Sequence, residues 1–90
     1  MSDRMIVKKP SPEELKKLGV ESWGIWNCKA STFHWHYDDR ETCFILEGKV
    51  TVKTDDQEVI FGKGDLVIFP KGLSCVWTIH EAVKKHYQFG

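Results

Sequence analysis

Short runs of alternating apolar and polar residues, separated by glycine, proline and aspartate, fill most of the chain after Trp23. This alternation is typical of β-strands that bury one face. It predicts strands at residues 25–29, 33–37, 41–47, 49–54, 57–61, 66–69, 75–80 and 84–89, with a short edge strand at 5–8. Gly48 between two of these runs predicts a tight hairpin. Many short strands at this spacing indicate an all-β sandwich or antiparallel barrel.

Residues 11–19 carry the only helical pattern. Ser11 can cap a helix, Pro12 suits its first position, and Glu14 completes a capping box. Gly19 ends the helix. We expect one short helix that covers an edge or an end of the sheet.

Length, charge and cysteine content exclude several classes of protein. Ninety residues predict a single domain spanning 1–90. Thirteen basic and thirteen acidic residues balance to a formal net charge of zero, which predicts no nucleic-acid or membrane partner. The three cysteines, Cys28, Cys43 and Cys75, are odd in number and widely spaced, so they form no disulfide framework. We expect a cytoplasmic protein, or an organellar one if a transit peptide has been removed.

Three candidate metal ligands lie close together in the sequence. His34 and His36 share one face of a strand, because side chains of a strand alternate. An antiparallel return brings Glu41 near His36, and we assign all three inward. An inward glutamate needs a partner, and neutral imidazoles with a carboxylate suit a divalent ion. The alternative is that the histidines are ordinary polar residues at a barrel mouth, while Glu41 pairs with Arg40 or a lysine.

The opposite face of the same strand carries an aromatic row, Phe33, Trp35 and Tyr37. Such a row is not expected to lie in water as one patch. It either fills the core with Trp23 and Trp26, which is the commoner role of aromatic residues, or is covered by a second subunit. A homodimer is compatible with either interpretation, and we expect one.

These residues match two motifs of a known family. The first motif is HxH, three or four residues, E, six residues, G; it is met by His34, His36, Glu41 and Gly48. The second is G, five residues, PxG, two residues, H, three residues, N; it is met by Gly64, Pro70 and Gly72, with Cys75 and Ile79 at the last two positions. The chain therefore resembles the cupins, whose fold is an antiparallel jelly-roll β-barrel, also called a double-stranded β-helix.

Within the cupins, the chain is most similar to the ureidoglycine aminohydrolase-like (cupin_3) subgroup. The segments that carry this similarity are ETCFILEGKV, GKGDLVIFPKG, and the ending with Trp77 and residues 83–87. The enzyme that names the subgroup contains two cupin units, whereas this chain has one. Its activity is therefore not transferred.

The resemblance implies a divalent metal (Zn, Fe, Cu, Ni or Mn) held by His34, His36 and Glu41. Cys75 stands at the fourth ligand position and is equally well explained as a thiolate ligand or as a buried, inert thiol. Without it, two histidines and one carboxylate leave open positions that suit non-haem iron or zinc-bound water. No catalytic residue is assigned.

The functional hypotheses span three classes. The first is a metal-dependent enzyme acting on a small polar metabolite. The second is a non-catalytic module that binds a small molecule or a metal, and the third is a structural barrel without a ligand. Trp77 is expected to pack below the site, while His80 and His86 are expected to be surface or structural residues.

Overall fold

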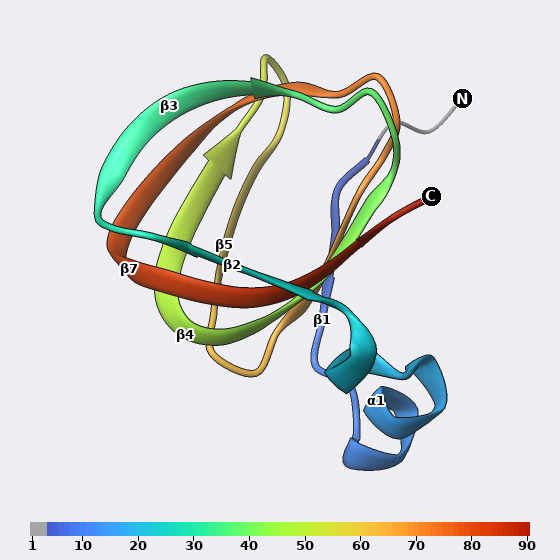
Figure 1. Cartoon of the computed structure of the whole chain (residues 1–90). Helices are drawn as coiled ribbons and strands as arrows, with labels where there is room; N and C mark the ends of the chain where they lie inside the picture. Colours follow the sequence, from blue (N-terminus) through green and yellow to red (C-terminus); the bar gives the residue numbers. More distant parts are fainter. Residues whose placement is uncertain (1–3) are drawn as a thin grey trace.

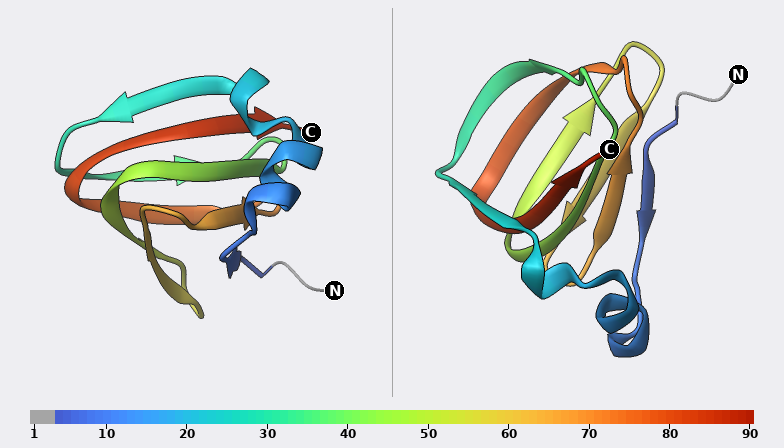
Figure 2. Two further views of the ribbon diagram at one scale, coloured as in Figure 1. Left: turned by 90° about the horizontal axis from the view of Figure 1, so that it is seen from below. Right: turned by 45° about the vertical axis from the view of Figure 1, so that its right-hand side comes forward.

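A computed structural model of the chain, which describes residues 4–90, contains one antiparallel sheet folded over so that its two halves face each other (Figures 1 and 2). The strands are β1 (Ile6–Lys8), β2 (Gly24–Cys28), β3 (Ser31–His36), β4 (Glu41–Lys53), β5 (Glu58–Gly62), β6 (Leu66–Phe69) and β7 (Ser74–Phe89). One half has the order β1-β6-β4-β7-β2, while in the other half β5 pairs with β4 and β3 pairs with β7. The predicted fold class, a jelly-roll β-barrel with one short helix, is confirmed.

The long strands β4 and β7 each run through both halves of the barrel. The predicted hairpin at Gly48 is therefore wrong, and residues 75–80 and 84–89 likewise belong to one strand. The pairing of β4 with β7 shifts register between Ile45 and Val50, so the strand bends there without reversing. Gly48 has a φ of 106°, and a Cβ at this position would lie 2.6 Å from the carbonyl oxygen of Ala82. Glycine is required here by the positive φ and by the close approach of the β7 backbone at this irregularity of the pairing.

The helix α1 (Pro12–Leu18) begins and ends where the sequence predicts. The Ser11 hydroxyl accepts a hydrogen bond from the backbone N–H of Glu14 at 3.2 Å, and Gly19 ends the helix with a φ of 71°. The Glu14 carboxylate does not close the capping box, because it pairs with Lys8 Nζ at 2.6 Å. The helix lies at one end of the barrel and buries none of its residues (Figure 1). It leads into a 3-10 turn, η1 (Val20–Ser22).

None of the helices in residues 4–90 combines the length and the apolar character needed to cross a membrane.

The two faces of β3 are opposite to the sequence assignment. The register with β7 pairs Phe33 with Trp77 and His34 with Val76. Since Trp77 faces the core, Phe33 does so as well, and Tyr37 beyond the end of the strand is only 1% exposed. The inward assignment of the histidine face is wrong because burying aromatic rings gains more free energy than burying imidazoles.

The core interpretation of the aromatic row is thereby confirmed for Phe33 and Tyr37, while Trp35 is 48% exposed. No second subunit is needed to cover Phe33 and Tyr37. The homodimer stays a prediction.

Candidate functional site

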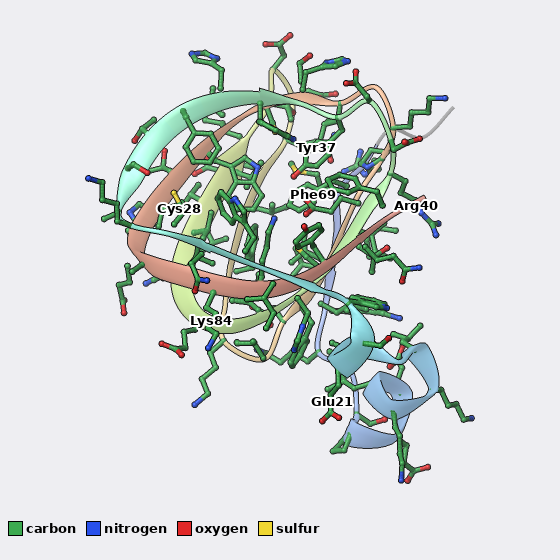
Figure 3. The ribbon with its side chains drawn as sticks, in the orientation of Figure 1. Glu21, Cys28, Tyr37, Arg40, Phe69 and Lys84 are labelled. Carbon is green, nitrogen blue, oxygen red and sulfur yellow. The ribbon has the colours of Figure 1, made fainter. Side chains whose placement is uncertain are left out.

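A cavity of about 480 Å³ lies inside the barrel. Aromatic side chains from β2, β3 and β7 form most of its wall: Trp26, Phe33, Trp35, Trp77, Tyr87 and Phe89. Trp35 and Phe89 are about half exposed and therefore mark its mouth. Figure 3 shows Cys28, Tyr37 and Phe69 directed into the barrel, whereas Arg40 and Lys84 point away from it. The size and apolar lining are those of a typical small-molecule site.

Three polar side chains meet in the wall of this aromatic cavity. The Lys85 ammonium donates to Glu41 Oε2 at 2.8 Å, and the Tyr37 hydroxyl donates to Glu41 Oε1 at 2.8 Å. Tyr37, Glu41 and Lys85 are 1%, 3% and 5% exposed, so all three are shielded from bulk water. Each carboxylate oxygen thus has its own donor, which is the condition for burying a charge at a tolerable cost.

Two indole rings surround the Lys85 ammonium. Its Nζ lies 4.5 Å from the ring centroid of Trp77 and 4.8 Å from that of Trp26. Both distances are within the range of cation–π attraction. Phe33 stacks on Trp77 with ring centroids 6.0 Å apart, which helps to hold the indole in place. The ammonium is therefore fixed by one carboxylate and two aromatic rings.

Lys85 was missed as a site residue, although the sequence contains a signal for it. Val83, Lys85 and Tyr87 share one face of β7, on which Val83 is buried in the core and Tyr87 lines the cavity. Lys84 occupies the other face and points out of the barrel (Figure 3). A lysine in phase with inward residues, on a strand beside an inward glutamate, indicates a buried ion pair.

Burial keeps the hydroxyl and thiol groups around this pair protonated. The pKa of Tyr37 lies well above its ordinary value, first because of burial and then because of the Glu41 carboxylate, so Tyr37 stays a hydrogen-bond donor. Burial raises the pKa of Cys75 to about 11 and that of Cys43 to about 12. Near neutral pH both cysteines are thiols, and a thiol is a poor metal ligand.

The four predicted metal ligands do not converge on one point, although His34, His36 and Cys75 border the same open hollow beside β3. His36 is exposed, and its Nδ1 lies 2.7 Å from the Ser74 hydroxyl. His34 is also exposed, at the border of the cavity, whereas Glu41 and Cys75 are buried inside the barrel. Within residues 4–90, no three histidine, cysteine, aspartate or glutamate side chains are close enough to hold a metal ion. The donor set does not fit a metal in this arrangement, and metal binding stays a prediction.

The alternative weighed for Glu41, pairing with a lysine, is the arrangement observed. Trp77 packs in the core as expected and also lines the cavity. His80 lies on the exterior, where its Nε2 is 2.8 Å from the hydroxyl of Thr51.

Comparison with protein families decides where the chain belongs. The model of the EutQ-like cupin domain matches residues 15–87. The chain is an EutQ-like cupin. The cupin resemblance is thus confirmed, while the closer likeness to ureidoglycine aminohydrolase is not shown and stays a prediction.

Solved structures agree with this membership. The cupin is 52% identical to a DUF861 family protein from Thermotoga maritima, with a TM-score of 0.95 over 97% of this chain and 100% of that one. It is 26% identical, with a TM-score of 0.67, to a Salmonella typhimurium protein named as a candidate EutQ of ethanolamine utilization. That match covers 73% of this chain and only 54% of the Salmonella protein.

The EutQ protein of Clostridium difficile is 23% identical, with a TM-score of 0.69 over 98% of this chain and 68% of that one, and supports the fold alone. A comparison with curated proteins finds no match.

Proposed function

We propose that this EutQ-like cupin is a binding module for a small organic molecule, held in the aromatic cavity beside Glu41 and Lys85. The observation that carries the proposal is the cavity of about 480 Å³ in which the cluster of Tyr37, Glu41 and Lys85 lies in a wall made mostly of aromatic rings. An apolar cavity with a few convergent polar groups is the usual form of a small-molecule site. The rings supply contact area, and the polar cluster orients the ligand.

The charges inside the cavity restrict the ligand. The Glu41 carboxylate and the Lys85 ammonium, 2.8 Å apart, neutralise each other. A ligand with a net charge would add an uncompensated charge to a poorly hydrated space, which is costly. We therefore infer a neutral ligand with a flat, unsaturated body, which stacks on the rings, and a carbonyl or amide group, which hydrogen-bonds to the polar cluster.

A panel of three probes of similar size tests this proposal. Benzamide is neutral, benzoate is an anion and benzylamine is a cation at pH 7, and each is titrated while the indole N–H resonances of Trp26 and Trp77 are followed by NMR. We expect benzamide to shift both resonances at lower concentration than the two charged probes. The proposal fails if none of the probes shifts them at millimolar concentration, or if a charged probe binds most tightly.

A matched pair of variants links binding to the cavity. Phe33 contributes a ring to the cavity wall, whereas its neighbour Thr32 lies on the outer face of β3 and is exposed. We expect Phe33→Ala to weaken benzamide binding about tenfold, and Thr32→Ala to leave it within twofold. Equal effects of the two variants would mean that the probe binds elsewhere.

The metal-dependent enzyme of small polar metabolites remains the alternative function, supported by the sequence motif alone. Elemental analysis of the purified protein and a turnover screen with added Zn, Fe, Cu, Ni or Mn test it. A stoichiometric metal ion together with metal-dependent turnover would replace the binding module by the enzyme.

A further inference from the structure

We infer that the Lys85 ammonium takes the place of a metal cation in this barrel, so that Glu41 has a cation supplied by the chain itself. The inference rests on the ion pair and does not depend on the proposed ligand. Glu41 is the carboxylate of the predicted ligand set and is buried inside the barrel. Lys85 Nζ lies 2.8 Å from its Oε2.

Each carboxylate oxygen of Glu41 already has a buried donor. Its Oε2 accepts from Lys85 and its Oε1 accepts from the Tyr37 hydroxyl, each at 2.8 Å. An ion that took the place of Lys85 or Tyr37 on Glu41 would displace that donor. The displaced donor would then lie buried without its partner, which is unfavourable for a hydroxyl and more so for an ammonium.

The other groups near the carboxylate also disfavour a divalent ion. A second cation close to Lys85 would be repelled by the ammonium inside a poorly screened interior. The nearby cysteines, Cys43 and Cys75, are buried thiols. The histidines that would supply neutral nitrogen ligands, His34 and His36, lie on the outer face of β3.

The two indole rings beside Lys85 give an independent reason to infer that the cation at Glu41 is a side chain of the protein and not a metal ion. Trp26 and Trp77 place their rings 4.8 Å and 4.5 Å from Lys85 Nζ. These two indoles hold an ammonium by cation–π attraction, but they offer no lone pair to a transition metal. The side chains around the Glu41 carboxylate therefore suit an ammonium such as that of Lys85 better than a transition metal.

Zinc and manganese titrations of the purified, EDTA-treated protein test the inference. Two histidines on an exposed strand face can bind zinc weakly without any role for the barrel, so the decisive comparison is between the parent and Glu41→Gln. We expect Glu41→Gln to bind zinc with the affinity of the parent, within twofold. If the parent binds zinc at all, we expect the double variant His34→Ala/His36→Ala to lose that binding. A tenfold or larger loss in Glu41→Gln would overturn the inference.

A second measurement uses the parent protein alone and holds even if Glu41→Gln does not fold. We expect the thermal midpoint to be the same with EDTA, with Mn²⁺ and with no addition, because the cation that balances Glu41 is covalently part of the chain. A midpoint that falls with EDTA and is restored by Mn²⁺ or Zn²⁺ would show that the barrel relies on a metal, contrary to the inference. Neither experiment involves the aromatic probes, so a failed probe titration leaves this result intact.

Discussion

Replacing Lys85 by methionine should produce one of the largest losses of stability available in this chain. Methionine keeps most of the apolar stem, so the change removes the ammonium while largely preserving the volume beside Trp26 and Trp77. Glu41 is then left as a buried carboxylate with the Tyr37 hydroxyl as its remaining side-chain donor. Because Glu41 is only 3% exposed, water compensates little of the lost attraction.

The expected magnitude follows from the cost of breaking a buried ion pair on one side only, about 3–5 kcal/mol. For a domain of this size, 3 kcal/mol corresponds to a fall in thermal midpoint on the order of 15 °C. The neighbouring Lys84 provides a matched control because it carries the same charge on the outward face of the same strand (Figure 3). We expect Lys84→Met to change the free energy of unfolding by less than about 0.5 kcal/mol.

Urea unfolding monitored by circular dichroism measures these differences. The double variant Glu41→Gln/Lys85→Met removes both charges, and replacing a whole buried pair by neutral groups is far less costly than breaking it. We expect the double variant to be at least 2 kcal/mol more stable than Lys85→Met, by the same estimate. The reasoning is refuted if Lys85→Met costs less than about 1 kcal/mol, or if the two single losses simply add.

Three further predictions address the close backbone contact at Gly48, the tyrosine and the thiols. Gly48→Ala should cost roughly 2 kcal/mol or more in urea unfolding, and clearly more than Gly64→Ala, because both glycines have positive φ but a Cβ would meet a neighbouring backbone at Gly48 and not at Gly64. Equal costs would contradict this close contact of β4 with β7. Tyr37→Phe should cost about 1–3 kcal/mol in the same assay by leaving one oxygen of Glu41 without its donor; an unchanged midpoint would argue against that hydrogen bond. Iodoacetamide at pH 8 should modify Cys28, at the cavity, before Cys75, because a pKa of about 11 leaves only about 0.1% of Cys75 as thiolate. Mass spectrometry of the digested protein at successive times identifies which cysteine is modified first, and faster modification of Cys75 would contradict the prediction.

Much of the fold could be predicted from local signals in the sequence. The positions of β5, β6 and the helix follow from alternation, turn residues and a capping serine, which act over a few residues. Gly48 marks the limit of this approach. A glycine between two strand-like runs is compatible with a hairpin or with a bend, and the decision depends on the close approach of Ala82, about 35 residues later in the sequence. Local patterns contain no information on such a contact.

The candidate site was predicted less well because alternation tells which residues share a face, but not which face is inward. Alternation separates His34 and His36 from Phe33 and Tyr37 correctly. The histidines were assigned inward as candidate metal ligands, whereas the register with β7 sets Phe33 against Trp77. The apolar character of the aromatic row was the physical argument against that assignment, and burial of those rings determines the outcome.

Glu41 shows how a correct requirement can lead to the wrong partner. An inward carboxylate must be balanced by a cation, and the sequence offered both a metal and a lysine for that role. The two solutions make different demands on the chain. A metal needs several ligands from different strands to converge on one point, whereas a lysine needs a single inward position on a neighbouring strand and enough reach. Lys85 meets that demand through the register of β7 alone, with its cation held between Trp26 and Trp77. A barrel whose histidines face outward can therefore keep the buried glutamate of the motif, and the cavity beside it becomes a site for an organic ligand.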